Sequence, residues 1–141
     1  MEFYVYSRQK AKSESYRLKV PTLIISITDP LSTLNTFAQN RNIVSICRVQ
    51  FDDVTRENAG PDDILMRVQD AQKIRDCVRA YADKVECIIV HCEAGISRSA
   101  GVMAAIQKHL IGDDSEIFNS NLYLPNEHCY RLMTSAFDGY F

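Results

Sequence analysis

Short apolar runs alternate along the chain with longer stretches in which apolar residues recur every three or four positions. The short runs are rich in β-branched and aromatic residues and predict strands at residues 3–6, 23–27, 43–51 and 87–90. The longer stretches predict helices at residues 7–16, 30–39, 62–81, 99–111 and from 125 or 126 onward. Strands that alternate with helices indicate an α/β fold in one domain over residues 1–141, with a mostly parallel central sheet of about four or more strands flanked by helices.

Three of the predicted helices carry residues that favour a helix end. Asp29 and Pro30 form an N-cap followed by a proline at the first helical position, and apolar residues then follow at helical spacing: Leu31, Leu34 and Phe37. Asp62 or Asp63 is expected to cap the longest helix, whose apolar stripe consists of Ile64, Val68, Ala71, Ile74, Val78 and Tyr81. Gly112 is expected to close the helix that ends near residue 111.

The predicted sheet brings two polar segments to one edge. Cys92 follows the strand at 87–90, which we expect near the centre of the sheet, and Asp52 and Asp53 follow the strand at 43–51. Ligands bind parallel α/β sheets at the carboxyl ends of the strands. We therefore expect these two segments to line the same site.

Residues 86–106 have the pattern of a buried strand, a tight loop and a buried helix. Such a turn directs successive backbone N–H groups inward, and the start of the helix adds partial positive charge, so that the loop binds anions. Cys92 at the mouth of the loop is placed to act as a thiolate nucleophile. Arg98 at its far end offers a planar fork that matches two oxygens of a phosphate. The group that fits is a phosphoryl group under attack by sulfur.

The cysteine content indicates the redox environment in which this chemistry would take place. The five cysteines are an odd number without close Cys-x-x-Cys pairs, which argues against a disulfide framework and a zinc site. A thiolate nucleophile needs a reducing environment, so we expect a cytoplasmic protein without a metal or other cofactor. No apolar run reaches a membrane-spanning length, and the amino-terminal residues do not resemble a signal peptide.

Charge is unevenly distributed along the chain. Residues 1–50 contain 7 Lys and Arg against 3 Asp and Glu, whereas residues 51–141 contain 9 against 15. The basic residues cluster at Arg8, Lys10, Lys12, Arg17 and Lys19. Such a cluster is typical of a solvated helix face, and the alternative is a patch for an anionic partner. An acidic chain is not typical of a dedicated nucleic-acid binder.

The pattern His91-Cys92-x-x-Gly95-x-x-Arg98-Ser99 resembles the signature of the cysteine-dependent protein tyrosine phosphatases. The dual-specificity branch is the most similar, through Ala94-Gly95 and Ser97-Arg98-Ser99. The resemblance implies a phosphocysteine intermediate on Cys92 and a phosphate clamp at Arg98. It also implies that Ser99 stabilises the departing thiolate and that His91 supports the loop. Phosphate would be bound by Arg98 and by backbone N–H groups of the loop residues Glu93, Ala94, Gly95, Ile96 and Ser97.

A phosphatase of this kind also needs an acid that protonates the leaving group. The segment Phe51-Asp52-Asp53 is similar to the general-acid loop of the superfamily, in which the acid stands two positions after an aromatic residue. On that match Asp53 is the acid and Asp52 is the alternative. If neither acts, Asp62 or Asp63 is the next candidate.

These features predict a phosphomonoesterase that acts on phosphotyrosine in proteins, with phosphoserine and phosphothreonine as further candidates. The loop between Cys92 and Arg98 contains one carboxylate and no cation, which disfavours phosphoinositides and other polyanions. Two alternatives stay open: a phosphate-binding module without turnover, and an RNA 5′-phosphatase of the same fold. We expect a monomer whose partner is a phosphorylated protein substrate, with no membrane partner and no nucleic acid.

Overall fold

The computed structural model describes residues 1–141 and contains one four-stranded sheet in which every pair of neighbouring strands is parallel. Its strands are β1 (Glu2–Ser7), β2 (Thr22–Thr28), β3 (Ile43–Gln50) and β4 (Cys87–Cys92). The order across the sheet is β1-β4-β2-β3, so β4 lies between two other strands. The predicted α/β class and the inner position of the strand before Cys92 are confirmed.

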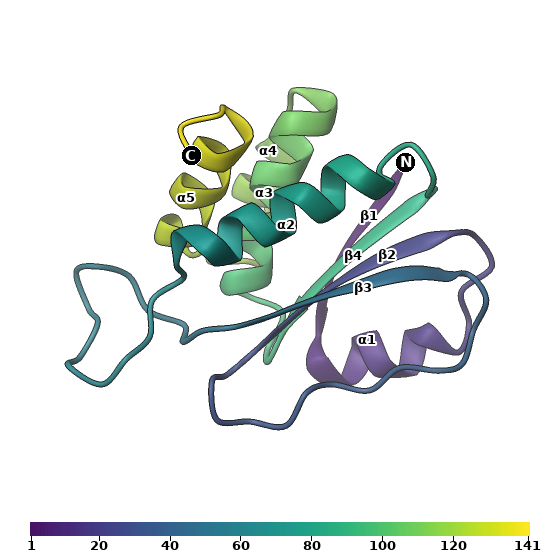
Figure 1. The fold of residues 1–141 in the computed structure, drawn as a ribbon, viewed down its shortest axis with the longest axis horizontal. Helices are drawn as coiled ribbons and strands as arrows, with labels where there is room; N and C mark the ends of the chain where they lie inside the picture. Colours follow the sequence, from purple (N-terminus) through teal and green to yellow (C-terminus); the bar gives the residue numbers. More distant parts are fainter.

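Helices cover both faces of the sheet (Figure 1). The short helix α1 (Arg8–Ser15) lies on one face. The other face carries α2 (Val68–Tyr81), α3 (Arg98–Ile111), α4 (Ser115–Phe118) and α5 (Glu127–Phe137). None of these helices combines the length and the apolar character needed to cross a membrane.

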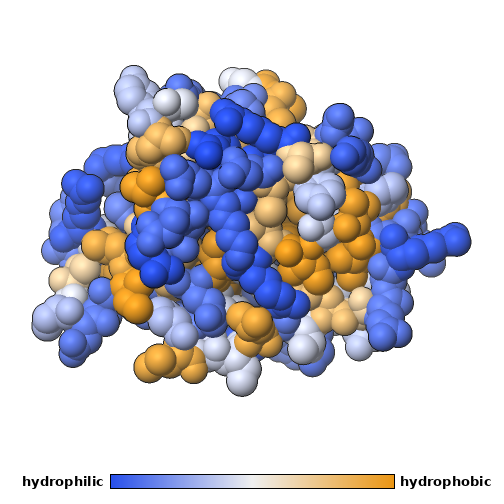
Figure 2. Space-filling view, viewed as in Figure 1, coloured by the Kyte–Doolittle hydropathy of each residue, from blue (hydrophilic) through white to orange (hydrophobic).

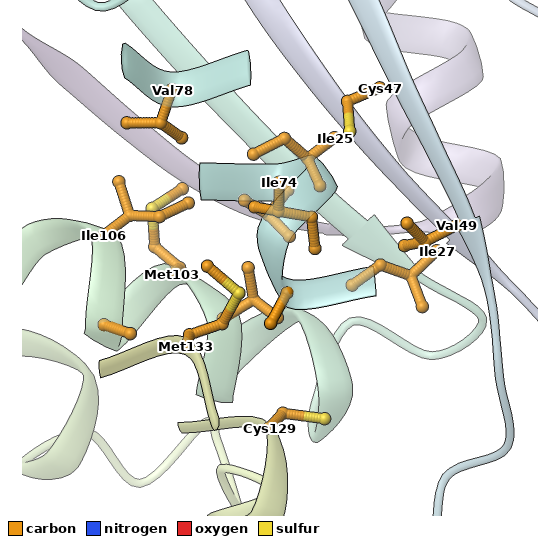
Figure 3. Packing of buried hydrophobic residues seen from close by; sticks show 14 of the residues in the cluster. Ile25, Ile27, Cys47, Val49, Ile74, Val78, Met103, Ile106, Cys129 and Met133 are labelled. Atoms are coloured by element: carbon orange, nitrogen blue, oxygen red, sulfur yellow. The ribbon is translucent and has the colours of Figure 1, made fainter. Parts of the chain in front are cut away.

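The larger core fills the space between the sheet and the helices α2, α3 and α5. Side chains of alternate strand residues meet helix residues there (Figure 3), among them Ile25, Ile27, Val49, Ile74, Val78, Met103, Ile106 and Met133. A smaller cluster on the α1 face contains Ile24, Cys87 and Ile89. Because successive strand residues point to opposite faces, His91 faces the side of α1 and Cys92 faces the larger core.

The helix predicted at residues 30–39 is wrong, since this segment runs across the molecule without regular structure. Asparagine side chains tie it to the backbone of α1 by tertiary hydrogen bonds instead. Asn35 donates to the carbonyl oxygen of Arg8 at 3.0 Å, and Asn40 donates to that of Ser15 at 3.0 Å. Leu31, which belonged to the expected apolar stripe, is fully exposed. The apolar residues of this segment recur at helical spacing, but they do not together form a buried face that would stabilise a helix.

The predicted start of the long helix at Asp62 or Asp63 is also wrong, because α2 begins at Val68. The preceding residues are held in an irregular segment by Asp52. Its carboxylate accepts a hydrogen bond from the Ile64 N–H at 2.8 Å, and its own N–H donates to the Ile64 carbonyl at 2.7 Å. The last stretch of the helix, to Tyr81, is as predicted.

The ends of α3 and α5 agree with the sequence. Gly112 follows α3 with a φ of 72°, a left-handed conformation that glycine adopts easily. Asn126 caps α5 by accepting a hydrogen bond from the Cys129 N–H at 3.0 Å.

Candidate active site

The loop of residues 93–97 joins the carboxyl end of β4 to the start of α3, as the sequence predicts. Gly95 is required at its centre for two reasons. Its φ is +73°, and a Cβ atom at this position would lie 2.6 Å from the Ser7 nitrogen at the end of β1. The loop therefore packs directly against β1.

Cys92 is 2 % exposed and its sulfur faces this loop. The Gly95 N–H points at Sγ from 3.3 Å, and Ser99 Oγ lies 3.0 Å from it. The backbone N–H groups of four loop residues donate to no acceptor within the protein: Glu93, Ala94, Ile96 and Ser97. The sulfur thus lies beside a set of donors that are free to bind an oxyanion.

Arg98 is 4 % exposed and its guanidinium is held on one side. Nη1 donates to Asp29 Oδ1 and to the Phe51 carbonyl, both at 2.7 Å. Nε is buried and has no hydrogen-bond partner. The edge formed by Nε and Nη2 is the one that a phosphate or carboxylate binds with two oxygens. An unpaired buried donor costs on the order of 1–3 kcal/mol, and an anion in the loop would remove that cost.

The two adjacent carboxylates of the 51–53 segment have different partners. Asp53 is exposed, and its Oδ1 accepts hydrogen bonds from Ser97 Oγ at 2.7 Å and from Asn126 Nδ2 at 3.0 Å. Asp52 instead binds the Ile64 N–H. The structure therefore brings Asp53, and not the carboxylate of Asp52, to the 93–97 loop.

His91 supports the loop from the opposite face of the sheet. Its Nδ1 lies 3.1 Å from the Cys92 carbonyl, which only accepts, so we assign the proton to Nδ1. Nε2 then accepts from Ser26 Oγ at 2.6 Å and from Asn35 Nδ2 at 3.3 Å. Burial lowers the pKa of His91 to about 4, so the ring is neutral at pH 7.

Solved structures with the same arrangement of elements are found among phosphatases. The human tyrosine phosphatase-like serine/threonine/tyrosine-interacting protein is similar with a TM-score of 0.68 at 16 % identity, over 98 % of this chain and 92 % of its own. Human DUSP28 is similar with a TM-score of 0.63 at 16 % identity, over 98 % of this chain and 92 % of its own. A mouse putative dual-specificity phosphatase is similar with a TM-score of 0.61 at 16 % identity, over 94 % of this chain and 79 % of its own.

The chain has the dual-specificity phosphatase fold. This likeness rests on structure alone, because no protein-family model and no curated protein matches the sequence. It covers nearly the whole chain, so the expectation that residues 91–99 raised about the fold is confirmed. One of these similar structures is named only phosphatase-like, so the fold by itself does not decide whether the chain is catalytic.

Within the dual-specificity phosphatase fold, the chain contains four cysteines besides Cys92. All five are free thiols; Cys47, Cys87 and Cys129 are buried, and Cys77 is partly buried. Burial raises the pKa of Cys87 to about 11 and holds the pKa of Cys129 above its usual range. These two side chains therefore remain neutral thiols near pH 7, as expected of core residues.

The sequence analysis did not assign four polar residues to the site. Asp29 holds Arg98, Asn126 holds Asp53, and Ser26 and Asn35 hold His91. Asp29 could have been found, because it follows β2, which pairs with β4, and so lies at the same sheet edge as Cys92. The other three contacts depend on tertiary packing between segments 56 to 73 residues apart, which no local pattern reveals.

Proposed function

We propose that this protein is a phosphomonoesterase that hydrolyses phosphotyrosine in proteins through a phosphocysteine intermediate. One observation carries the proposal: Cys92 Sγ faces a loop of free N–H donors, and the buried Nε of Arg98 beside it has no partner. A tetrahedral oxyanion held by these donors would place its central atom next to the sulfur. The mouse phosphatase of this fold was crystallised with zinc tungstate, which contains such an oxyanion.

In the first step, the Cys92 thiolate attacks phosphorus, and the S–P bond forms as the bond from phosphorus to the ester oxygen breaks. Arg98 and the loop N–H groups bind the three non-bridging oxygens, over which the charge is spread in the transition state. Asp53 gives its proton to the departing phenolate oxygen, a contribution of typically 10²–10⁴-fold. Its contact with Ser97 supports this assignment, because it orients the carboxylate toward the loop.

In the second step, water attacks the phosphocysteine, Asp53 accepts a proton from that water, and the S–P bond breaks. The products are inorganic phosphate and the Cys92 thiolate. The Ser99 hydroxyl is placed to donate a hydrogen bond to the departing thiolate, with Oγ 3.0 Å from Sγ. Asp29 acts as a positioning residue, since it fixes Nη1 of Arg98 and leaves the other edge of the guanidinium for phosphate.

The second candidate is a binding module that holds phosphotyrosine without turnover, and one similar structure named phosphatase-like favours it. A complete set of Cys92, Arg98, Ser99 and Asp53 supports the enzyme instead. A cysteine nucleophile must stay reduced to act, which supports a location in a reducing compartment such as the cytoplasm.

Hydrolysis of p-nitrophenyl phosphate separates the two candidates. We expect turnover that survives a metal chelator and is lost on alkylation of thiols. Cys92→Ser should abolish turnover and keep phosphate or vanadate binding, because the loop N–H groups and Arg98 remain. Absence of turnover in the wild type would favour the binding module, and a serine variant with a tenth of the wild-type rate would exclude Cys92 as the nucleophile.

A further inference from the structure

A groove of about 570 Å³ opens directly beside the 93–97 loop. It is lined by the end of β1, the first turns of α1, the 33–36 segment and Glu93. The side chains that the argument uses are Arg8, Lys12 and Glu93. The mechanism proposed above employs none of them.

Hydrogen bonds tie the groove to the nucleophile. The Arg8 N–H donates to the Glu93 carbonyl at 3.1 Å, and Glu93 is the residue that follows Cys92. On the other side, buried Asn35 donates to the Arg8 carbonyl and contacts His91, which itself binds the Cys92 carbonyl. The backbone of Arg8, which lines the groove, is therefore held at a fixed position relative to the 93–97 loop.

The groove carries an excess of positive charge. Arg8 is held in place by the Thr33 carbonyl at 2.7 Å and the Thr33 hydroxyl at 3.3 Å. Its ion pair with Glu93 is long, at 3.9 Å, and the Glu93 side chain is 55 % exposed, so this pair contributes little. Lys12 is exposed and has no carboxylate partner. Two cations thus face one weakly engaged carboxylate.

We infer that this groove is a second anion subsite, which binds the carboxylate of an acidic residue close to the phosphotyrosine of a peptide substrate. The inference rests on the proposed function and adds its substrate class: phosphotyrosine peptides with an acidic flank. A single carboxylate fits better than a polyanion, because Glu93 lies between the groove and the loop and repels a second dense charge.

The test compares two matched phosphotyrosine peptides, one with aspartate on both sides of the phosphotyrosine and one with asparagine at these positions. The wild type should show kcat/KM about three- to tenfold higher for the acidic peptide at low salt, as expected of two partly exposed charge pairs. Lys12→Gln and Arg8→Gln should each reduce this ratio toward one. Glu93→Gln should increase it, because the competing carboxylate is removed.

Lys19→Gln is the matched control, because Lys19 is an exposed lysine of the same basic cluster that does not line the groove. It should leave the ratio unchanged. A ratio of one in the wild type, or a ratio that Lys12→Gln and Lys19→Gln lower equally, would overturn the subsite. Both results are distinct from failure of the proposed function, which would appear as no hydrolysis of p-nitrophenyl phosphate. A preference for 5′-triphosphate RNA that depends on Lys12 would assign the groove to another anion and overturn the peptide assignment.

Discussion

Asp52 and Asp53 are neighbours in the chain and point to different partners. The carboxylate of Asp52 holds the Ile64 N–H and so fixes the segment that precedes α2. The carboxylate of Asp53 accepts hydrogen bonds from the side chains of Ser97 and Asn126 at the edge of the 93–97 loop. The Asp52 carboxylate is occupied with its own segment, whereas the Asp53 carboxylate lies at the 93–97 loop, which makes Asp53 the stronger candidate for the proposed acid.

Asp53→Ala should therefore lower kcat strongly for alkyl or phenyl phosphates, whose leaving groups need a proton, and much less for p-nitrophenyl phosphate. It should also remove the alkaline limb of the pH–rate profile, because that limb reports deprotonation of the acid. Asp52→Ala is the matched control and should keep the wild-type dependence on the leaving group. The assignment fails if Asp52→Ala shows the loss instead.

His91 gives the protein a dependence of stability on pH. Burial lowers its pKa to about 4 in the folded state, against about 6.5 in the unfolded chain. The unfolded chain therefore binds the proton more readily, so the stabilisation is present above pH 6.5 and decreases as the pH falls toward 4. The full difference is on the order of 3 kcal/mol.

This prediction is measured as the free energy of unfolding in urea between pH 4 and 7.5. The wild type should lose stability over this range more steeply than His91→Asn, which lacks the titrating ring. The comparison uses the slope and not the absolute value, because the substitution also removes hydrogen bonds to Ser26 and Cys92. Equal slopes in the two proteins would contradict the assignment of a neutral buried ring.

At the level of elements, α3 and the start of α5 approach so closely that only glycine fits between them. A Cβ atom on Gly101 would lie 2.5 Å from the Asn126 carbonyl oxygen. The side chain of Asn126 holds Asp53, and its N–H donates to the Ser97 carbonyl at 3.0 Å. The helix contact therefore sets the position of the candidate acid.

Gly101→Ala should destabilise the fold by about 1–3 kcal/mol through overpacking and should lower kcat more for poor leaving groups than for good ones. Gly112→Ala serves as the control. It introduces a strained left-handed alanine at about 1 kcal/mol, but nothing lies within 4 Å of the new methyl group. Thermal unfolding measures the stability of the two variants, and kcat for phenyl phosphate and p-nitrophenyl phosphate measures their dependence on the leaving group. A Gly101→Ala protein with the wild-type leaving-group dependence would refute the link to Asp53.

The sequence predicted the elements best where local pattern and burial coincide. The four strands and helices α3 and α5 were found because their apolar residues face a core on the side that the periodicity indicates. The segment at 30–39 failed because side chains from distant positions bind its backbone: Ser15 Oγ accepts from the Ala38 N–H at 2.8 Å, and Arg48 donates to the Asn35 carbonyl at 2.6 Å. The start of α2 failed for the same reason, since Asp52 captures the Ile64 backbone from twelve residues away. Cys92, Arg98 and Ser99 follow one another on a single strand–loop–helix and could be predicted together, whereas Asp29 and Asn126 reach the site from other elements.

On the scale of the whole molecule, the distribution of charge bears on which class of anionic substrate the protein takes. The chain is acidic beyond residue 50, and its local excess of basic over acidic residues lies in and around α1. The face seen in Figure 2 is mainly hydrophilic, with hydrophobic residues in separate patches.

We therefore expect phosphotyrosine peptides to be hydrolysed with kcat/KM well above that for inositol lipids or 5′-triphosphate RNA. The physical reason is that the 93–97 loop offers one phosphate cradle and a carboxylate, Glu93, in place of further cations. Assays of the three substrates at equal ionic strength measure this ranking. Faster turnover of either polyanion would exclude the protein-phosphatase assignment and leave the cysteine chemistry intact.

The strand order β1-β4-β2-β3 has a consequence for biosynthesis. The strand β4 is the last to emerge from the ribosome, yet β1 pairs with no other strand and β2 needs β4 on one of its sides. A nascent chain that stops before residue 87 therefore has a sheet split into two unconnected parts. Pairings between β1 and β4 span some 85 positions, so the sheet closes late and slowly. Cys92, the candidate nucleophile, ends the strand whose insertion joins the two parts of the sheet, and the 93–97 loop, Arg98 and Ser99 that surround its sulfur follow directly in the chain.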